Sequence, residues 1–234
     1  MTQRVVIAGG TGEVGQRLIG LMAGDEALQV RVLTRRPGLP VQTPNLAALP
    51  FDYDDAAAYG RLFLAPCDLL LIALGTTRAK AGSDAAFLKV DRDYPIQLIQ
   101  ALAAAWPAAR VGLVSSVGAD QPRGLYLGAK AAVEAALAGS KLAHAIARPS
   151  LLRSERREFR FMEVAMDRSL SPAILALGRG LFNHSRGYWR WAPVHVREVA
   201  AALLSATLAL EPGQRRFLEG LDLHPGPIAR WGKP

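Results

Sequence analysis

The sequence predicts an α/β fold: a doubly wound parallel sheet followed by a short C-terminal cap. Two observations predict it. Short apolar runs rich in β-branched residues alternate with amphipathic segments in units of about 30 residues, as βαβ units do. The first apolar run, residues 4–8, is followed at once by a cluster of glycines, which is typical of a buried parallel strand that turns tightly into a helix.

The individual elements follow from the same patterns. Apolar runs predict strands at residues 4–8, 28–34, 46–50, 68–74, 110–116 and 142–148, and an edge strand at 217–218. Apolar positions at helical spacing predict a helix containing residues 14–22, a long helix at 83–105 and further helices at 125–137, 161–177 and 196–210. Asp54 or Asp55 is the expected N-cap of a short helix between the third and fourth strands, and Pro212-Gly213 stops the last helix.

Composition and charge exclude several classes of protein. Of 234 residues, 50% are hydrophobic and 21% are charged, which excludes a disordered or collagen-like chain. The net charge of +8 makes an anionic partner a candidate. Cys67 is the only cysteine, so an internal disulfide and a Cys-rich metal site are excluded, and we expect no metal. With no recognisable leader and no apolar run near the ~20 residues that span a bilayer, we expect a soluble, cytoplasmic protein that does not bind membranes.

The glycine cluster fits a phosphate-binding turn. It fits the dinucleotide fingerprint in two registers, because either Gly9 or Gly10 can be the first glycine before Gly12 and Gly15. The expected cofactor-binding residues of this turn are Gly9, Gly10, Thr11, Gly12, Glu13, Val14 and Gly15. Such a turn lets backbone approach a pyrophosphate at a helix N-terminus. A purely structural glycine turn is the alternative.

The choice of cofactor depends on the end of the second strand. About 20 residues beyond Gly15, where an acidic residue would bind the 2′-hydroxyl of NAD, the chain has Arg35 and Arg36. Guanidinium groups can hold a 2′-phosphate through paired hydrogen bonds, so we expect NADP(H) rather than NAD(H). The alternative is that these arginines are only solvated. Asp52, after the third strand, is a candidate for the adenine amino group, or else a loop or cap residue.

A second cluster lies later in the chain. Tyr126 and Lys130 are four residues apart on the expected helix at 125–137, so their side chains share one face of it. Ser115 and Ser116 end the expected fifth strand. With the glycine fingerprint, this set resembles the short-chain dehydrogenase/reductase superfamily. The alternative is a tyrosine packed beneath a loop, beside a surface lysine.

That resemblance implies a role for each residue. Tyr126 becomes the general acid that protonates a carbonyl oxygen as hydride arrives. Lys130 favours the phenolate, brings the pKa of Tyr126 nearer to neutral, and binds the nicotinamide ribose. Ser116 holds the substrate oxygen, with Ser115 as the alternative because the register of a Ser-Ser pair is open.

A closer resemblance is to the atypical reductases related to the Tat-interactive protein oxidoreductase and their small bacterial NAD(P)-binding homologues. It covers most of residues 4–160 and rests on the segments at 74–82, 89–94, 115–120 and 125–127: LGTTRAKAG, KVDRDY, SSVGAD and LYL. The resemblance implies that Gly75 and Thr76 pass over the adenosine ribose and pyrophosphate, and that Arg148-Pro149 approaches the nicotinamide. One departure matters: Asp91 follows Val90 where many extended members have asparagine, so the asparagine-assisted proton relay of many classical members has no evident counterpart.

Domain organisation follows from these assignments. We expect a single NAD(P)-binding domain over residues 1–234, with a cofactor-binding core at 1–149, an irregular substrate cap at 150–195, and a C-terminal helix and edge segment at 196–234. Residues 148–198 hold ten arginines against five acidic residues, which suggests an anionic substrate or docking partner; a solvated, arginine-rich surface is the alternative, and the sequence slightly favours it.

The expected function is an NADPH-dependent reductase of a small carbonyl compound. The alternative is an NADPH-binding sensor or interaction protein with little catalysis. A nucleic-acid binder has no motif to support it, and a monomer or a homodimer is expected. His195 is expected to start a helix rather than to catalyse, and Trp189-Arg190-Trp191 either lines a pocket or anchors a loop.

Overall fold

Seven parallel strands form the centre of the molecule. The structure, a computed structural model, describes residues 2–35, 42–153 and 186–224. The order across the sheet is β3-β2-β1-β4-β5-β6-β9, with every neighbouring pair parallel. The strands are β1 (Gln3–Ala8), β2 (Leu28–Thr34), β3 (Leu46–Pro50), β4 (Leu69–Ile72), β5 (Arg110–Val114), β6 (Ala143–Ala147) and β9 (Arg215–Leu218). The predicted doubly wound parallel sheet is confirmed.

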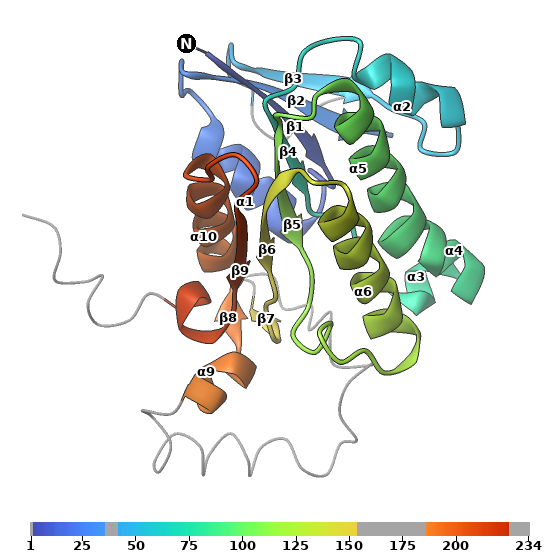
Figure 1. The fold of residues 1–234 in the computed structure, drawn as a ribbon, viewed down its shortest axis with the longest axis vertical. Coiled ribbons are helices and arrows are strands. Elements are labelled where there is room, and N and C mark those ends of the chain that lie inside the picture. Colours follow the sequence, from blue (N-terminus) through green and yellow to red (C-terminus); the bar gives the residue numbers. More distant parts are fainter. Residues whose placement is uncertain (1, 36–41, 154–185, 225–234) are drawn as a thin grey trace, which may run out of the picture.

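Helices cover both faces of this sheet (Figure 1). They are α1 (Glu13–Met22), α2 (Ala56–Leu62), α3 (Arg78–Ala81), α4 (Asp84–Leu88), α5 (Tyr94–Ala105), α6 (Gly124–Gly139), α9 (Arg186–Trp191) and α10 (Val196–Leu208). On one face, α1 and α10 pack against alternate residues of β1, Val5 and Ile7. On the other face, α2, α5 and α6 pack against Val6 and Ala8, which alternate with Val5 and Ile7 along β1. A strand buried on both sides reads as a continuous apolar run, which is why the sequence reveals it.

The strand order opens a crevice where the cofactor fingerprint lies. The chain leaves β1 toward β2 and β3 on one side and returns to β4 on the other, so the connections at the carboxyl ends of β1 and β4 run in opposite directions. Ligands of such sheets bind at this switch point. Helix α9 and a short parallel pair, β7 (Leu152–Arg153) with β8 (Val194–His195), lie near the same edge of the sheet (Figure 1).

The predicted long helix at 83–105 is wrong as a single α-helix. The structure divides it into α4, a π-helical segment η1 (Lys89–Asp93) and α5, and the N–H of Tyr94 bonds to the carbonyl five residues back, on Lys89. Pro95 explains the wider turn: it has no N–H for the carbonyl of Asp91, and in an α-helix its ring would clash with that carbonyl.

Other differences are smaller. Three predicted strands are shorter: β4 loses Asp68 and residues 73–74, β5 loses 115–116, and β6 loses Leu142 and Arg148. Asp55, not Asp54, caps α2, its carboxylate accepting from the N–H of Ala57. The 3₁₀ turn η2 (Gly220–Leu223) follows β9. The predicted helix at 161–177 lies outside the described residues, and the domain boundaries at 149 and 195 stay predictions.

Among the described residues, none of the helices combines the length and apolar character needed to cross a membrane. No group of three or more histidine, cysteine or acidic side chains there is arranged to hold a metal ion.

Candidate functional site

The loop after β1 is a close-packed turn that requires glycine. Gly9 has a φ of +93°, and a Cβ on it would lie 2.4 Å from the carbonyl oxygen of Ala73, beyond β4. A Cβ on Gly15 would lie 2.2 Å from the carbonyl oxygen of Gly9, and one on Gly10 would lie 2.3 Å from Val32. Steric clashes thus require glycine at both Gly9 and Gly10, the two candidates for the first glycine of the fingerprint. The same contacts bring the loop after β1 against the loop after β4.

This turn delivers an open helix N-terminus to the crevice. Gly12 is the N-cap of α1 and offers no side chain to bond the first N–H groups. The first bond of the helix runs from the N–H of Gln16 to the carbonyl of Gly12, at 2.8 Å, so the N–H groups of residues 13–15 stand at its open end. Thr11 is exposed, whereas the side chain of Val14 is buried in the core, which leaves Val14 only its backbone for a ligand. Such an end fits a pyrophosphate.

The far side of the crevice carries the predicted adenosine contacts. Arg35 is exposed at the end of β2, and Arg36 lies outside the described residues. The charge of Arg35 acts on Tyr53, whose pKa burial raises and Arg35 lowers, so these side chains are neighbours at the ends of β2 and β3. Asp52 is exposed, and its carboxylate accepts a hydrogen bond from the N–H of Asp54 at 2.9 Å. That bond makes Asp52 a turn residue.

The predicted tyrosine, lysine and serine come together at the carboxyl end of β5. Ser116 and Tyr126 share a hydrogen bond between their side chains. The ammonium of Lys130 lies 5.8 Å from the centre of the Tyr126 ring, one helical turn along α6. Phe87 of α4 packs near the tyrosine, with ring centres 6.3 Å apart. The arrangement places a phenol, a hydroxyl and a cation at one point of the crevice.

Asp91 joins this set, and sequence reasoning missed it. One oxygen of its buried carboxylate lies 2.9 Å from the ammonium of Lys130, and the other accepts the N–H of Thr76 at 2.7 Å. A Cβ on Gly75 would lie 3.6 Å from the carboxylate and 4.0 Å from the ammonium. Lys130 is therefore fixed against the loop after β4, which in turn touches Gly9. The phosphate-binding turn and the catalytic candidates form one continuous site.

The electrostatics of Tyr126 correct one expectation. Burial raises the pKa of its hydroxyl, and Lys130 and Ser116 only partly oppose this. Lys130 does lower the pKa of Tyr126, as the sequence led us to expect. The pKa is nevertheless raised overall, because burial outweighs the effect of Lys130. Burial alone would lower the pKa of Lys130, but Asp91, with smaller contributions from Tyr126 and Glu134, raises it. At neutral pH the site therefore holds a protonated phenol beside an ammonium.

The structure separates the two serines. Ser115 is buried, and its hydroxyl donates a 2.5 Å hydrogen bond to Glu134, a buried residue of α6. Ser116, the next residue, is the one bonded to Tyr126. Of the pair, Ser116 alone faces the tyrosine, as the first choice from sequence has it. Pro149 is buried, and its carbonyl accepts the N–H of Val117, so it supports the serine loop from below.

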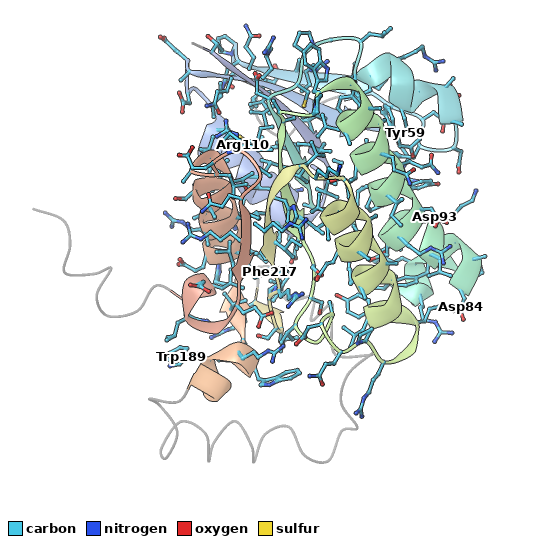
Figure 2. The ribbon with its side chains drawn as sticks, in the orientation of Figure 1. Tyr59, Asp84, Asp93, Arg110, Trp189 and Phe217 are labelled. Carbon is cyan, nitrogen blue, oxygen red and sulfur yellow. The ribbon has the colours of Figure 1, made fainter. Side chains whose placement is uncertain are left out.

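A line of alternating charges continues from Lys130 along the edge of the sheet. Arg148, at the end of β6, forms hydrogen bonds to Glu134, the shortest of 2.5 Å, and contacts Glu219 at 2.7 Å. Its guanidinium also lies over the ring of Phe217, 4.6 Å from the centre. Phe217, labelled in Figure 2, belongs to the edge strand β9. The pKa of Arg148 is raised, because the two carboxylates outweigh burial. The side chain of Arg148 is thus a largely buried cation paired within the chain, and the approach of Arg148-Pro149 to a nicotinamide stays a prediction.

The line ends on α9. Arg190 pairs with Asp120, beyond Ser116, at 2.7 Å and with Glu219 at 3.2 Å. Two of the ten arginines in residues 148–198 are therefore already paired with carboxylates of the chain. Neighbouring Trp189 meets the ring of His224, 4.9 Å away, whereas Trp191 is 61% exposed. Within the tryptophan segment, Trp189 therefore anchors α9 against His224, and Trp191 is exposed.

His195 does what the sequence suggests. It is the N-cap of α10, and its Nδ1 accepts the N–H of Arg197. The signal that could have revealed Glu134 is its spacing: it lies four residues after Lys130, on a face of α6 that is otherwise apolar. No comparable signal pointed to Asp91, because its partner lies on a different helix.

Comparison with known proteins agrees with this geometry. Residues 9–170 match the family described as NAD(P)H-binding. A Candida albicans protein named "Protein FMP52, mitochondrial" is 34% identical over 160 residues, 65% of this chain and 68% of that protein. A Coccidioides immitis protein of the same name is 29% identical over 243 residues, 93% of each. Both names say mitochondrial, so the sequence-based expectation of a cytoplasmic location is contradicted.

Solved structures share the fold. The oxidoreductase ylbE from Lactococcus lactis gives a TM-score of 0.64 at 18% identity, covering 91% of this chain and 89% of that one. The enzyme WbmH from Bordetella bronchiseptica, in complex with NAD+, gives 0.66 at 15%, covering 93% and 75%. These likenesses show a shared fold. The chain belongs to the family described as NAD(P)H-binding, whose model matches residues 9–170.

Proposed function

We propose that this protein is an NADPH-dependent reductase of a small carbonyl compound. The observation that carries the proposal is the hydrogen bond between Ser116 and Tyr126 beside the ammonium of Lys130. A protonated phenol, a hydroxyl and a fixed cation are what a carbonyl oxygen needs when it accepts hydride and a proton. The same residues adjoin the glycine turn through Gly75, so donor and acceptor sites are contiguous.

Each residue has a separate task in this proposal. When bound, NADPH supplies the hydride. The hydroxyl of Ser116 orients the carbonyl oxygen, and Tyr126 donates its proton to that oxygen. Lys130 binds ribose hydroxyls and stabilises the phenolate that is left. Helix α9, in the described part of the predicted cap, lies on the substrate side of the crevice, where the Arg190–Asp120 pair holds it against the loop after Ser116.

Replacing the tyrosine tests the chemistry. We expect Tyr126→Phe to lower kcat for NADPH oxidation with the best substrate of a carbonyl panel by about 10²- to 10⁴-fold, because the general acid is lost. The dissociation constant for NADPH, measured by fluorescence titration, should change little. Tyr59→Phe is the matched control, since it removes a buried hydroxyl that bonds the carbonyl of Tyr53, away from Lys130.

Two outcomes would contradict the proposal. Turnover that survives Tyr126→Phe would show that another group protonates the substrate. NADPH binding without turnover of any carbonyl, in the intact protein, would favour a cofactor-binding sensor instead.

We also propose that the cofactor is NADPH rather than NADH, with Arg35 at the 2′-phosphate. Arg35→Ala should weaken NADPH binding about tenfold, because charge-assisted hydrogen bonds are lost, and leave NADH binding nearly unchanged. Arg61→Ala, which removes an exposed arginine that pairs with Asp55 on α2, is the control. Equal dissociation constants for the two cofactors in the unaltered protein would reject this preference.

A further inference from the structure

Asp91 is a buried carboxylate that the proposed reaction does not use. It is 1% exposed, and within the described residues its two oxygens face the ammonium of Lys130 and the N–H of Thr76. A buried carboxylate is costly unless it is paired and hydrogen-bonded. Both conditions are met here by groups of the candidate site rather than by groups of the core.

The π-helical turn is what places Asp91 there. A turn of i→i+5 bonds contains one more residue than an α-turn and rotates the following side chains relative to the preceding ones. Asp91 lies at the centre of this turn, between Phe87 of α4 and Tyr94 of α5, which both point into the molecule. Such segments are frequent at functional sites.

The charges around Lys130 determine what Asp91 can do. Asp91 faces Lys130 from η1, and Glu134 and Tyr126 face it from its own helix. Ser116 faces Tyr126 from the end of β5. Glu134 is itself engaged by Ser115 and Arg148, whereas within the described residues the carboxylate of Asp91 pairs with Lys130. Asp91 therefore opposes part of the electrostatic pull that Lys130 exerts on the phenol.

We propose that Asp91 is a positioning residue: it clamps Lys130 to the loop after β4 and offsets part of its charge, so that it adds to the burial that keeps Tyr126 a protonated phenol. The consequence for turnover rests on the proposed reductase function, because a proton donor must be protonated before hydride arrives. Where many classical short-chain reductases have an asparagine-assisted proton relay, this chain has a fixed ion pair that leads to a backbone N–H. Lys130 then acts as an anchored cation, and its proton is not passed on through Asp91.

The test measures Tyr126 in the cofactor-free protein. Its titration is the difference in ultraviolet phenolate absorbance between each variant and the same variant carrying Tyr126→Phe. Asp91→Asn keeps the shape and the bond to Thr76 but removes the charge, and should move the titration of Tyr126 down by about one pH unit or more. Lys130→Met should move it up. Asp68→Asn, which breaks an ion pair with Arg4 at the other end of β4, should leave it in place.

A second set of variants guards against loss of folding. In Asp91→Asn/Lys130→Met both members of the buried pair are neutral, a change that folded proteins usually tolerate, and the titration should return above that of Asp91→Asn. Asp91→Glu keeps the charge and should stay close to the unaltered protein. An unmoved titration in Asp91→Asn, or an upward one, would overturn the proposal.

Turnover gives an independent reading. If the protein reduces a carbonyl, activity should fall as pH rises through the pKa of Tyr126, and Asp91→Asn should move this alkaline limit to lower pH. A protein with no turnover would reject the proposed reductase and leave the titration result standing. A shifted kcat with an unmoved pH profile would show Asp91 to be merely structural.

Discussion

Gly9→Ala is expected to lower the free energy of unfolding by about 2–5 kcal/mol, with a left-handed backbone and a steric clash both contributing. The new Cβ would lie 2.4–2.7 Å from three backbone atoms of Ala73 and Leu74. Backbone cannot rotate away as a side chain can, so the loop after β1 must separate from the loop after β4. Because these loops carry the phosphate-binding turn and Gly75, we also expect NADPH binding to be lost. Urea unfolding and fluorescence titration measure the two effects.

Two other glycines separate the contributions. Gly24 has a φ of +79° with nothing within 4 Å of an added Cβ, so Gly24→Ala isolates the backbone conformation, about 1–2 kcal/mol. Gly20 lies in α1, also with open space, and Gly20→Ala should stabilise by about 0.5–1 kcal/mol. If Gly9→Ala costs no more than Gly24→Ala, the contact between the loops is not rigid. If Gly9→Ala lowers the free energy of unfolding by less than expected and leaves NADPH binding intact, the turn is not the phosphate site.

Arg148→Met should also be severe, costing about 3–5 kcal/mol, because it leaves the carboxylate of Glu134 buried without its cation. The side chains of Arg148 and Glu134 are only 12% and 10% exposed, so water cannot replace the lost partner. Methionine keeps much of the volume over Phe217, which separates the loss of charge from the loss of packing. The measurement is urea unfolding followed by circular dichroism.

The partner variant distinguishes charge from bulk. Adding Glu134→Gln to Arg148→Met removes the stranded charge and should recover part of the loss. Arg216→Met, on the exposed part of β9, should change stability by less than about 0.5 kcal/mol. A double variant no more stable than Arg148→Met alone would mean that packing, not the buried ion pair, accounts for the effect.

The sheet was predictable because strands that are buried on both faces appear in the sequence as continuous apolar runs. Strand β4 is apolar throughout, and β1 and β6 are apolar except at Gln3, Arg4 and His144, so their positions could be found without knowing what packs on them. The division of the long helix was not predictable from periodicity, because it depends on one contact, between Pro95 and the carbonyl of Asp91. Edge strand β9 was indicated only by Phe217-Leu218, since its arginines face solvent.

The site was predictable where spacing along one element decides it. Tyr126 and Lys130 share a helix, and Ser116 follows a strand that ends beside it. Asp91 was interpreted as a departure from a family pattern, because only the folded chain brings η1 against α6. The net pKa shift of Tyr126 also required the fold, since burial and not the neighbouring lysine dominates it.

The alternating line of charges constrains how this sequence can change over time. From Asp91 through Lys130, Glu134, Arg148, Glu219 and Arg190 to Asp120, each charge has neighbours of opposite sign. A single replacement strands its neighbour, whereas a joint replacement of two neighbours does not. Substitutions at positions 134 and 148 should therefore occur together among relatives, and a relative that has lost one charge should have lost the other.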